Sequence, residues 1–488
     1  MIVRSRGEHA GERRRFIRPP ERSRASKRER VVAIVGAGAS GTLAAVHLLR
    51  RGSARVVLID PALHGHGVAY STKDKQHLLN VPAAAMSGLA DEPADFLHWC
   101  RARGVQAEPE DYLPRRLYGA YLQELLARFG DRSRLEIVRE RVENVLEPLF
   151  HGGVRVSLAG GRTLAADAVV LALGNPPPAP LRDVPASCRT ALIDDPWTPQ
   201  ALRRLRGSRR VAILGSGLTA VDVALSVLSG NPDAEVSAIS RHGWLPRAQL
   251  PGRPSLPLTP ELVHGCSLDQ ILATVGRELA ARPDAWREVI DGLRPLTTKL
   301  WQGLTRAERE HFERDLRASW EIHRHRLAPP VAARVDESIA SGRLHVRSGG
   351  VRSLCPAPAG RVRVELGDGD LLDADVLVNA TGPSRSLSAC TDPLTGRLLA
   401  SGRARPDELG IGIATSPDGA LIDVDGEVSR YCFTLGPPRR GELLESTAIP
   451  EIRQQAAALA SLLTGTSAQR GRASAAIPSN AASGFIGS

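Results

Sequence analysis

The sequence predicts an α/β fold with two Rossmann-like dinucleotide-binding domains in series, in the two-dinucleotide-binding flavoprotein arrangement, with a helical insertion. Two glycine-rich turns carry this prediction, because each follows an apolar strand and opens a helix. The first lies in "VVAIVGAGASG" (31–41) and the second in "VAILGSGLTAVD" (211–222). A third observation is that each half closes with an apolar strand ending in glycine, "TLAADAVVLALGNP" and "DLLDADVLVNATGP".

Composition and charge fit this fold class. The chain has 488 residues, of which 42% are hydrophobic and 24% charged, enough for two or three domains with real cores. Most of the net charge of +11 lies in residues 1–30, which hold eleven Arg or Lys and four Glu. We interpret this segment as a disordered basic tail and expect no specific nucleic-acid binding. Since it has no apolar stretch and four acidic residues, it resembles neither a secretory signal nor a transit peptide.

Two further patterns bear on location. Val31–Leu49 is apolar enough to imitate a membrane span, but its three glycines and His47 fit a nucleotide-binding turn and helix better. We therefore expect no membrane span. The six cysteines show no CxxC pair and no zinc spacing, which predicts reduced, mostly buried thiols in a cytoplasmic protein.

In the first unit, the β-branched run 31–35 is typical of a strand buried on both faces. Gly36 permits the tight turn, Gly38 lets the backbone approach a pyrophosphate, and Gly41 lets the helix lie close to the strand. The helix N-terminus, which includes Ser40, offers N–H groups to the phosphates. A second strand ends at Asp60, where an acidic residue can bind ribose hydroxyls.

The second unit repeats the plan with one difference. Gly215 and Gly217 are followed by a helix start whose alanine replaces the third glycine, an accepted variant. That helix start consists of Leu218, Thr219 and Ala220. The next strand ends at Ser240-Arg241 without an acid, and an arginine there can pair with a 2′-phosphate. We therefore assign FAD to the first unit and NADPH to the second.

The closing strands place two more glycine positions at the cofactors. Gly174 ends the strand that closes the first unit, and Thr381-Gly382 ends the one that closes the second. The predicted domains are an FAD-binding domain of residues 31–180 and 384–463 and an NAD(P)H-binding domain of residues 181–383. Residues 256–345 of the latter form a largely helical insertion, which we expect to cover the cofactor cleft. Residues 464–488 form a second disordered tail.

Beyond the glycine motifs, five stretches carry a resemblance to a known family. They are "GVAYSTKDKQHLLNVPAAAMSGLADEPADFLHW" (67–99), "SRHGWLPR" (240–247), "EIHRHRLAP" (321–329), "LVNATGP" (377–383) and "LGPPRRGELLESTAIPEIRQQAAALA" (435–460). From about residue 30 to 463 the sequence resembles the bacterial FAD/NAD(P)-binding proteins that include FAD-dependent urate hydroxylases and the nitrosuccinate-forming aspartate N-monooxygenase.

The resemblance implies a flavin monooxygenase. In such enzymes NADPH reduces FAD, the reduced flavin activates O2 as a C4a-hydroperoxide, and one oxygen atom passes to a small polar or nitrogen-containing substrate. The cofactor carries this chemistry, so no nucleophilic Ser or Cys is expected. The resemblance does not specify the substrate, and the oligomeric state stays open.

Three segments are expected to complete the flavin site. "HLLNVPA" (77–83) is predicted to lie against the isoalloxazine, with Asn80 and the backbone at Val81 as contacts. "LGPPRRG" (435–441), with Gly436 and Pro437, supplies a rigid turn near the pyrimidine end of the ring. "STAIPEIR" (446–453) starts a helix whose N-terminus can face that ring. For each segment a purely structural loop or turn is the alternative.

The histidines are weaker candidates. His64 and His66 form an HxH without further ligands nearby, so no metal site is predicted. His323 and His325 would project in different directions from a helix, which argues against a joint ligand role. With Asn80 they are the candidates for catalytic side chains lining a substrate pocket.

Alternatives to a monooxygenase remain open from the sequence. An NAD(P)H-dependent flavin reductase or oxidase needs only the two nucleotide sites, whereas a disulfide reductase needs a redox-active cysteine pair near the flavin, and residues 60–99 contain no cysteine. A non-enzymatic redox sensor, with the basic tail contacting a partner, is a further interpretation.

Overall fold

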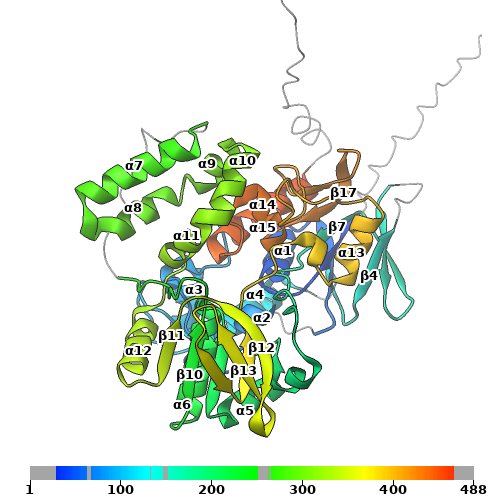
Figure 1. Ribbon diagram of the computed structural model, residues 1–488. Helices are drawn as coiled ribbons and strands as arrows, with labels where there is room; N and C mark the ends of the chain where they lie inside the picture. Colours follow the sequence, from blue (N-terminus) through cyan, green and yellow to red (C-terminus); the bar gives the residue numbers. More distant parts are fainter. Residues whose placement is uncertain are drawn as a thin grey trace, which may run out of the picture.

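A computed structural model describes residues 29–62, 67–131, 133–146, 152–250, 262 and 265–465. These residues form two α/β units and a separate group of helices (Figure 1). The two predicted tails and the His64–His66 pair lie outside the described residues, apart from Glu29, Arg30 and residues 464–465.

The first unit is built on a six-stranded sheet with the order β16-β17-β7-β1-β2-β3. All neighbouring strands are parallel except β16 and β17. The strands are β1 (Arg30–Val35), β2 (Ala54–Ile59), β3 (Leu135–Val138), β7 (Ala168–Leu171), β16 (Ala420–Ile422) and β17 (Val428–Thr434). The sheet therefore combines strands from both ends of the described chain, because β16 and β17 return to it after the second unit.

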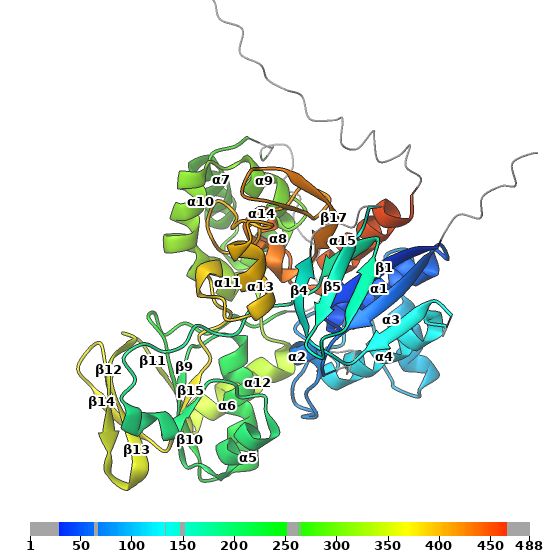
Figure 2. The same cartoon turned by 90° about the vertical axis from the view of Figure 1, so that its right-hand side faces the viewer.

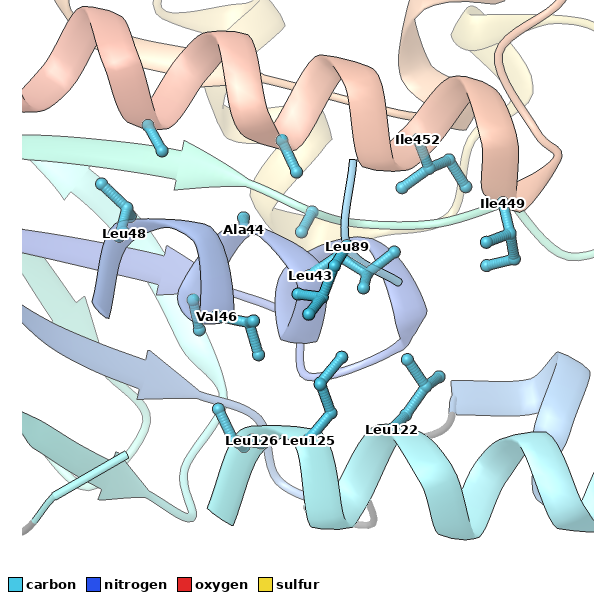
Figure 3. Close-up of a cluster of buried hydrophobic side chains, with 14 of the residues drawn as sticks. Leu43, Ala44, Val46, Leu48, Leu89, Leu122, Leu125, Leu126, Ile449 and Ile452 are labelled. Atoms are coloured by element: carbon cyan, nitrogen blue, oxygen red, sulfur yellow. The ribbon is translucent and has the colours of Figure 1, made fainter. Parts of the chain in front are cut away.

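Both faces of this sheet are covered, which explains the uninterrupted apolar sequence of β1. Val32 and Ile34 pack among the helices on one face, while Ala33 and Val35 pack into a second core on the other. The helical face carries α1 (Ala39–Arg50), α4 (Arg115–Phe129) and α15 (Ile449–Thr464), whose leucines and isoleucines meet in one cluster (Figure 3).

The other face is covered by a small antiparallel sheet and one helix. The sheet consists of β4 (Val142–Leu146), β5 (Val154–Leu158) and β6 (Thr163–Ala166), and the helix is α13 (Pro393–Ala400). The loop region between β2 and β3 adds α2 (Gly67–Tyr70) and α3 (Asp95–Ala102). Strands β4, β5 and β6 pair as antiparallel neighbours ahead of β7, the strand that closes the first unit.

The second unit is a five-stranded, wholly parallel sheet with the order β11-β10-β9-β15-β8. Its strands are β8 (Leu192–Ile193), β9 (Arg210–Leu214), β10 (Glu235–Ile239), β11 (Leu344–Arg347) and β15 (Val376–Asn379). Helices α5 (Pro199–Gly207), α6 (Leu218–Gly230) and α12 (Pro329–Ala340) pack in its core. The opposite face carries the antiparallel sheet β12 (Val351–Ala357), β13 (Arg361–Leu366) and β14 (Leu371–Ala374). Two dinucleotide-binding folds in series are thus confirmed (Figure 2).

The helical group is shorter than the sequence suggests. It contains α7 (Leu268–Ala281), α8 (Trp286–Leu293), α9 (Thr297–Gly303), α10 (Arg306–His311) and α11 (Arg317–Arg324), with a π-helical turn over Phe312–Leu316. The sequence predicts an insertion over 256–345, but α12 and β11 belong to the second α/β unit, because β11 pairs in parallel with β10. Amphipathic spacing alone does not distinguish a helix that packs on a sheet from one in a separate bundle.

The helical group packs against the last segment of the first unit. The indole N–H of Trp301 donates to the carbonyl oxygen of Gly441 at 2.7 Å, and Arg294 pairs with Glu451 at 2.8 Å. Arg324 and Glu445 form a buried ion pair with two hydrogen bonds, of 3.0 and 3.1 Å. These contacts involve α14 (Arg440–Leu443) and the start of α15. They join the helical group to the segment between β17 and α15.

Within the described part of the chain, none of the helices combines the length and the apolarity required to cross a bilayer. All six cysteines are free thiols. Only Cys100 and Cys188 are buried, so the expectation that most of them are buried is wrong. Cys355 is exposed because β12 lies on the outer side of its small sheet.

Candidate cofactor and substrate site

The first glycine loop joins β1 to α1, and its outer glycines are required by the protein's own backbone. Gly36 has φ +102°, and a Cβ there would overlap the carbonyl oxygen of Ala172 at the end of β7. A Cβ on Gly41 would overlap the carbonyl oxygen of Gly36. These two positions hold strand and helix together whether or not a ligand is present.

Gly38 is different, because the fold itself leaves room for a side chain there. It has an ordinary φ of −70° as the N-cap of α1, and a Cβ would lie 3.6 Å from Cα of Gly67, a normal contact. No side chain caps the helix, and its first turn, which includes Ser40, holds no acidic residue. An uncapped helix start without a negative charge fits a phosphate group.

Asp60 lies at the end of β2, as predicted, and contacts the loop directly. One carboxylate oxygen accepts the N–H of Ala37 at 2.8 Å, and the other accepts the N–H of Ala62 at 2.8 Å. The carboxylate therefore orders the glycine loop. Because each oxygen has two lone pairs, this is compatible with the predicted contact to a ribose, which stays a prediction.

The "LGPPRRG" segment lies against the same helix start. Gly436 has φ +76°, and a Cβ there would come within 2.8 Å of the Ser40 hydroxyl oxygen. Its N–H donates to the side-chain carbonyl of Gln455 at 2.9 Å, while Pro437 is buried beside it. Two segments some 400 residues apart in sequence are thus brought to one loop.

The strand that closes the first unit joins this group. After β7, Gly174 takes φ +70°, and the next residue, Asn175, accepts a hydrogen bond from Arg440 at 2.8 Å. Burial, with a contribution from the charge of Arg317, lowers the pKa of Arg440 to about 10. Sequence reasoning missed Arg440, although it lies within the quoted "LGPPRRG" motif.

Segment 77–83 lies between the two α/β units. His77 bonds through Nε2 to the Ser226 hydroxyl of α6 at 2.8 Å, and Arg115 pairs with Asp222 of the same helix at 2.6 Å. Asn80 is half-buried three residues further on, and Val81 packs on the first core. Asn80 thus lies three residues from a contact between the two units, and its role at a cofactor stays a prediction.

The second glycine loop repeats the first. Gly215 has φ +115°, and a Cβ would overlap the carbonyl oxygen of Ala380 at the end of β15. Gly217 is the N-cap of α6 with φ −77°, and no heavy atom of the protein lies within 4 Å of a Cβ built there. As in α1, the first turn carries no acidic residue and no side chain caps it. This turn contains the half-buried Leu218 and Thr219 and the buried Ala220.

The exit of β15 contributes a second ordered turn beside this loop. The hydroxyl of Thr381 donates to the side-chain oxygen of Asn379 at 2.7 Å, and Gly382 takes φ +85°. Ala380 and Thr381 of the predicted "LVNATGP" motif thus lie against Gly215.

Arg241 follows β10 and is exposed at the surface. The Ser240 hydroxyl before it bonds to the hydroxyl of Ser216 at 2.9 Å and accepts the N–H of Gly243 at 3.0 Å. A second arginine, Arg385, lies near Arg241 and was not predicted from the sequence. Burial, together with the charges of Arg440 and then Arg241, lowers the pKa of Arg385 to about 10. Arg385 is already paired with Glu313 of the helical group, whereas Arg241 is exposed.

The two histidines of α11 are engaged within their own helix. Nδ1 of His323 bonds to the carbonyl oxygen of Ser319 at 2.8 Å, and Nδ1 of His325 contacts the carboxylate of Glu321. The His323 ring meets the edge of Trp286 at 5.1 Å between ring centroids. Neither histidine is among the residues that line the cavity between the helical group and the first unit, although Trp286 is, and their role at a substrate stays a prediction. The i, i+4 spacing turns Nδ1 of each ring back onto the preceding turn.

This cavity, of about 570 Å³, lies where the helical group, the first unit and the segment after β10 meet. It is lined by Pro82, Glu110, Tyr112, Gln249, Leu250, Pro283, Asp284, Trp286, Arg287, Glu288 and Asp291. Pro82 follows Asn80 and Val81 directly, so the cavity begins at the segment predicted to contact the flavin ring. Among the described residues, no three His, Cys, Asp or Glu side chains are grouped as a metal site requires.

Comparison with known proteins agrees with this geometry. Residues 33–176 match a family model described as FAD-NAD(P)-binding. The chain has the fold of flavin-dependent monooxygenases. It superposes on the ornithine N-hydroxylase of Kutzneria sp. 744 with a TM-score of 0.61 and 17% identity, over 91% of this chain and 99% of that one. For the cadaverine monooxygenase of Erwinia amylovora the values are 0.62 and 15%, over 89% and 94%.

Sequence relatives cover less of the chain. An uncharacterised protein of Mycobacterium tuberculosis, with a counterpart in Mycobacterium bovis, is 32% identical over 164 residues. The match spans 28% of this chain and 30% of the length of those relatives.

Proposed function

We propose that this protein is an FAD-dependent, NADPH-using monooxygenase that acts on a small polar or nitrogen-containing molecule. The observation that supports it most directly is the pair of glycine loops, each opening an uncapped helix at the junction of two α/β units. The solved structures with this fold include an ornithine N-hydroxylase studied with reduced FAD, NADP+ and L-ornithine, and a cadaverine monooxygenase bound to FAD. The sequence motifs favour a closer affinity with the urate hydroxylase and aspartate N-monooxygenase type.

In this proposal the first unit holds FAD. The phosphate-binding turn would consist of Gly36, Gly38, Ser40 and Gly41. Asp60 would bind the ribose beside the loop that it already orders. The rest of the cofactor would be surrounded by Asn80, Val81, Gly174, Gly436 and Pro437. FAD, when bound, accepts a hydride from NADPH and then reacts with O2 to oxygenate the substrate.

The second unit would hold NADPH. Its phosphate turn consists of Gly215, Gly217, Leu218, Thr219 and Ala220, and the open space at Gly217 fits a close backbone approach. Arg241 would bind the 2′-phosphate, while Thr381 and Gly382 would border the nicotinamide side of the site. The contacts of His77 and Arg115 with α6 would keep the two cofactors facing each other.

The helical group would shield the reacting centre from solvent. Its contacts with residues 441–451 fix it over the junction of the units, where it would exclude water from the reaction. Of the three predicted catalytic side chains, Asn80 lies two residues before Pro82 and His323 contacts Trp286, and both Pro82 and Trp286 line the cavity. A cytoplasmic location and a small-molecule substrate with O2 as partners belong to this proposal.

Rapid-mixing spectroscopy of the purified holoenzyme tests the proposal. NADPH should bleach the flavin absorbance without air, and admission of O2 should return it in two resolved steps. A single-step return with stoichiometric hydrogen peroxide would favour the flavin reductase or oxidase alternative. Failure of NADPH to reduce the bound flavin would overturn the assignment of the second unit.

A further inference from the structure

Arg440 is a buried cation at the carboxyl edge of the first sheet. It begins α14, and 7% of its surface is exposed. Its guanidinium donates to the side-chain oxygen of Asn175, which follows β7, at 2.8 Å. Strands β17, β7 and β1 are parallel, so their carboxyl ends meet at this edge. The chain adds β2 on one side of β1 and β7 on the other, which makes the edge a switch point of the kind at which open parallel sheets bind their ligands.

The positive charge of Arg440 has no acidic partner among the described residues, since none of their carboxylates lies within ion-pairing distance of it. Glu321 of α11 acts on it only through its charge and is itself paired with Arg317 and His325. Arg317 acts on it as well, with a charge of the same sign. The guanidinium is therefore held by one hydrogen bond to a neutral amide instead of by an ion pair.

The ion pairs around Arg440 leave one positive charge in excess. Arg385 lies within electrostatic range of Arg440 but is paired with Glu313, which also pairs with Arg317. This group thus contains three arginines and two glutamates, with His325 counted as neutral. Burial, followed by the charge of Arg317, lowers the pKa of Arg440 only to about 10, so the guanidinium remains charged at neutral pH. A buried charge without a counter-ion is costly, and binding of an anion would remove that cost.

The predicted position of the flavin points to the anion concerned. Arg440 belongs to "LGPPRRG", the segment expected at the pyrimidine end of the ring, and Asn175 follows Gly174 of the same expected site. The ring system of oxidised flavin is uncharged. A hydride from NADPH brings two electrons and one proton, which leaves one negative charge on the pyrimidine part of the ring. This new charge would lie beside the uncompensated cation.

We propose that Arg440 stabilises the negative charge of reduced FAD and thereby raises the reduction potential of the bound flavin. The inference rests on the FAD- and NADPH-dependent function proposed above. The electrons balance without another reactant, because NADPH loses a hydride and becomes NADP+, and the neutral ring gains that hydride and becomes the anion. If Arg440 instead bound a permanent anion, such as a phosphate of the cofactor, it would favour both oxidation states equally, and its removal would leave the potential unchanged.

Potentiometric titration of the FAD-loaded protein, with xanthine and xanthine oxidase as the reducing system and without NADPH or substrate, tests this. Arg440→Gln should lose about ten-fold of the preference for reduced over oxidised flavin, which lowers the midpoint potential of this two-electron couple by about 30 mV. Arg440→Lys keeps the charge and should stay near the parent. The absorbance of the reduced flavin should show the anion taking up a proton at a pH about one unit higher in Arg440→Gln, because a nearby cation opposes that protonation.

Asn175→Asp provides a second test, which decides alone if Arg440→Gln loses FAD, because Asn175 is exposed and the variant leaves the arginine in place. The new carboxylate would pair with the guanidinium, so the potential should fall by about the same amount. Arg430→Gln is the matched control, since it removes an exposed arginine near the opposite end of β17, and its potential should equal that of the parent. Parental potentials in Arg440→Gln and Asn175→Asp, or an equal fall in Arg430→Gln, would overturn the proposal.

Anaerobic mixing of the same preparations with NADPH keeps this inference separate from the proposed function. Reduction by NADPH, with a potential that does not depend on Arg440, overturns the inference and leaves the NADPH-dependent function standing. A potential that falls in Arg440→Gln, in a protein that NADPH does not reduce, supports the inference and overturns that function. A parent protein that binds no FAD overturns both.

Discussion

Replacing Gly217 by alanine tests ligand binding at the second glycine loop without disturbing its backbone. The residue has φ −77°, which alanine adopts freely, and no protein atom lies within 4 Å of the added Cβ. The neighbouring Gly215 offers no such test, because its φ of +115° and the carbonyl oxygen of Ala380 exclude a side chain. A loss of NADPH binding in the Gly217→Ala variant would therefore report on the ligand and not on the backbone.

The expected magnitudes follow from what the methyl group displaces. An N-cap change from glycine to alanine costs about 0.5 to 1 kcal/mol of stability. A methyl group between the backbone and a pyrophosphate would lengthen one or two charge-assisted hydrogen bonds, each contributing roughly 1.5 to 3 kcal/mol. The Kd for NADPH should thus rise by about 10- to 100-fold, while the FAD content stays the same.

Stopped-flow reduction of the bound flavin at increasing NADPH concentration measures this Kd, and thermal unfolding measures the stability. Gly276→Ala is the control, since this glycine of α7 also has no atom within 4 Å of an added Cβ and lies far along the chain from both loops. An unchanged Kd in Gly217→Ala would refute the placement of NADPH at this loop. Loss of FAD from Gly217→Ala, with FAD retained in Gly38→Ala, would show that the two cofactor assignments are reversed.

Three further predictions concern single side chains. Arg241→Ala should raise the Kd for NADPH by about ten-fold and leave that for NADH nearly unchanged, and an unaltered preference would contradict its role at the 2′-phosphate. Arg324→Met should destabilise the protein by about 3 to 5 kcal/mol in urea unfolding because it leaves the buried carboxylate of Glu445 unpaired, and a loss below about 1 kcal/mol would show that the pair contributes little. Burial opposes ionisation of Glu321, but the hydrogen bond with His325 and nearby positive charges lower its pKa to about 2. Because this is below the ordinary 4.5, its stabilising contribution is complete above about pH 4.5 and disappears as the pH falls toward 2, so wild type and Glu321→Gln should converge in stability over that interval.

The elements that the sequence predicts best are those whose pattern is local. A β-branched run, a glycine turn and an alanine-rich helix are contiguous, so β1 and α1, and β9 and α6, are recognisable from short windows of sequence. The glycines that the backbone requires, such as Gly36 and Gly215, belong to the same local pattern. The two glycine loops of the candidate site therefore follow from the sequence alone.

The predicted limits of the helical insertion, residues 256–345, were wrong because an amphipathic pattern does not show which surface a helix covers. Both α11 and α12 are amphipathic, but α12 packs on the second sheet and α11 on the segment after β17. Which partner an amphipathic helix covers depends on the path of the chain between the elements, and periodicity does not record that path.

The amino-acid sequence alone shows that the chain contains two copies of a strand–glycine–helix unit, and that arginine rather than an acid follows the second strand of the second copy. The distant segments that complete each site become apparent only from the folded structure. The contact of Gly436 with Ser40, the bond between Arg440 and Asn175, and the carboxylate-lined cavity all join residues that are far apart in the chain. The physical reason is that each local unit follows from backbone sterics and hydrophobic periodicity, whereas a binding cavity forms only where separate units pack together.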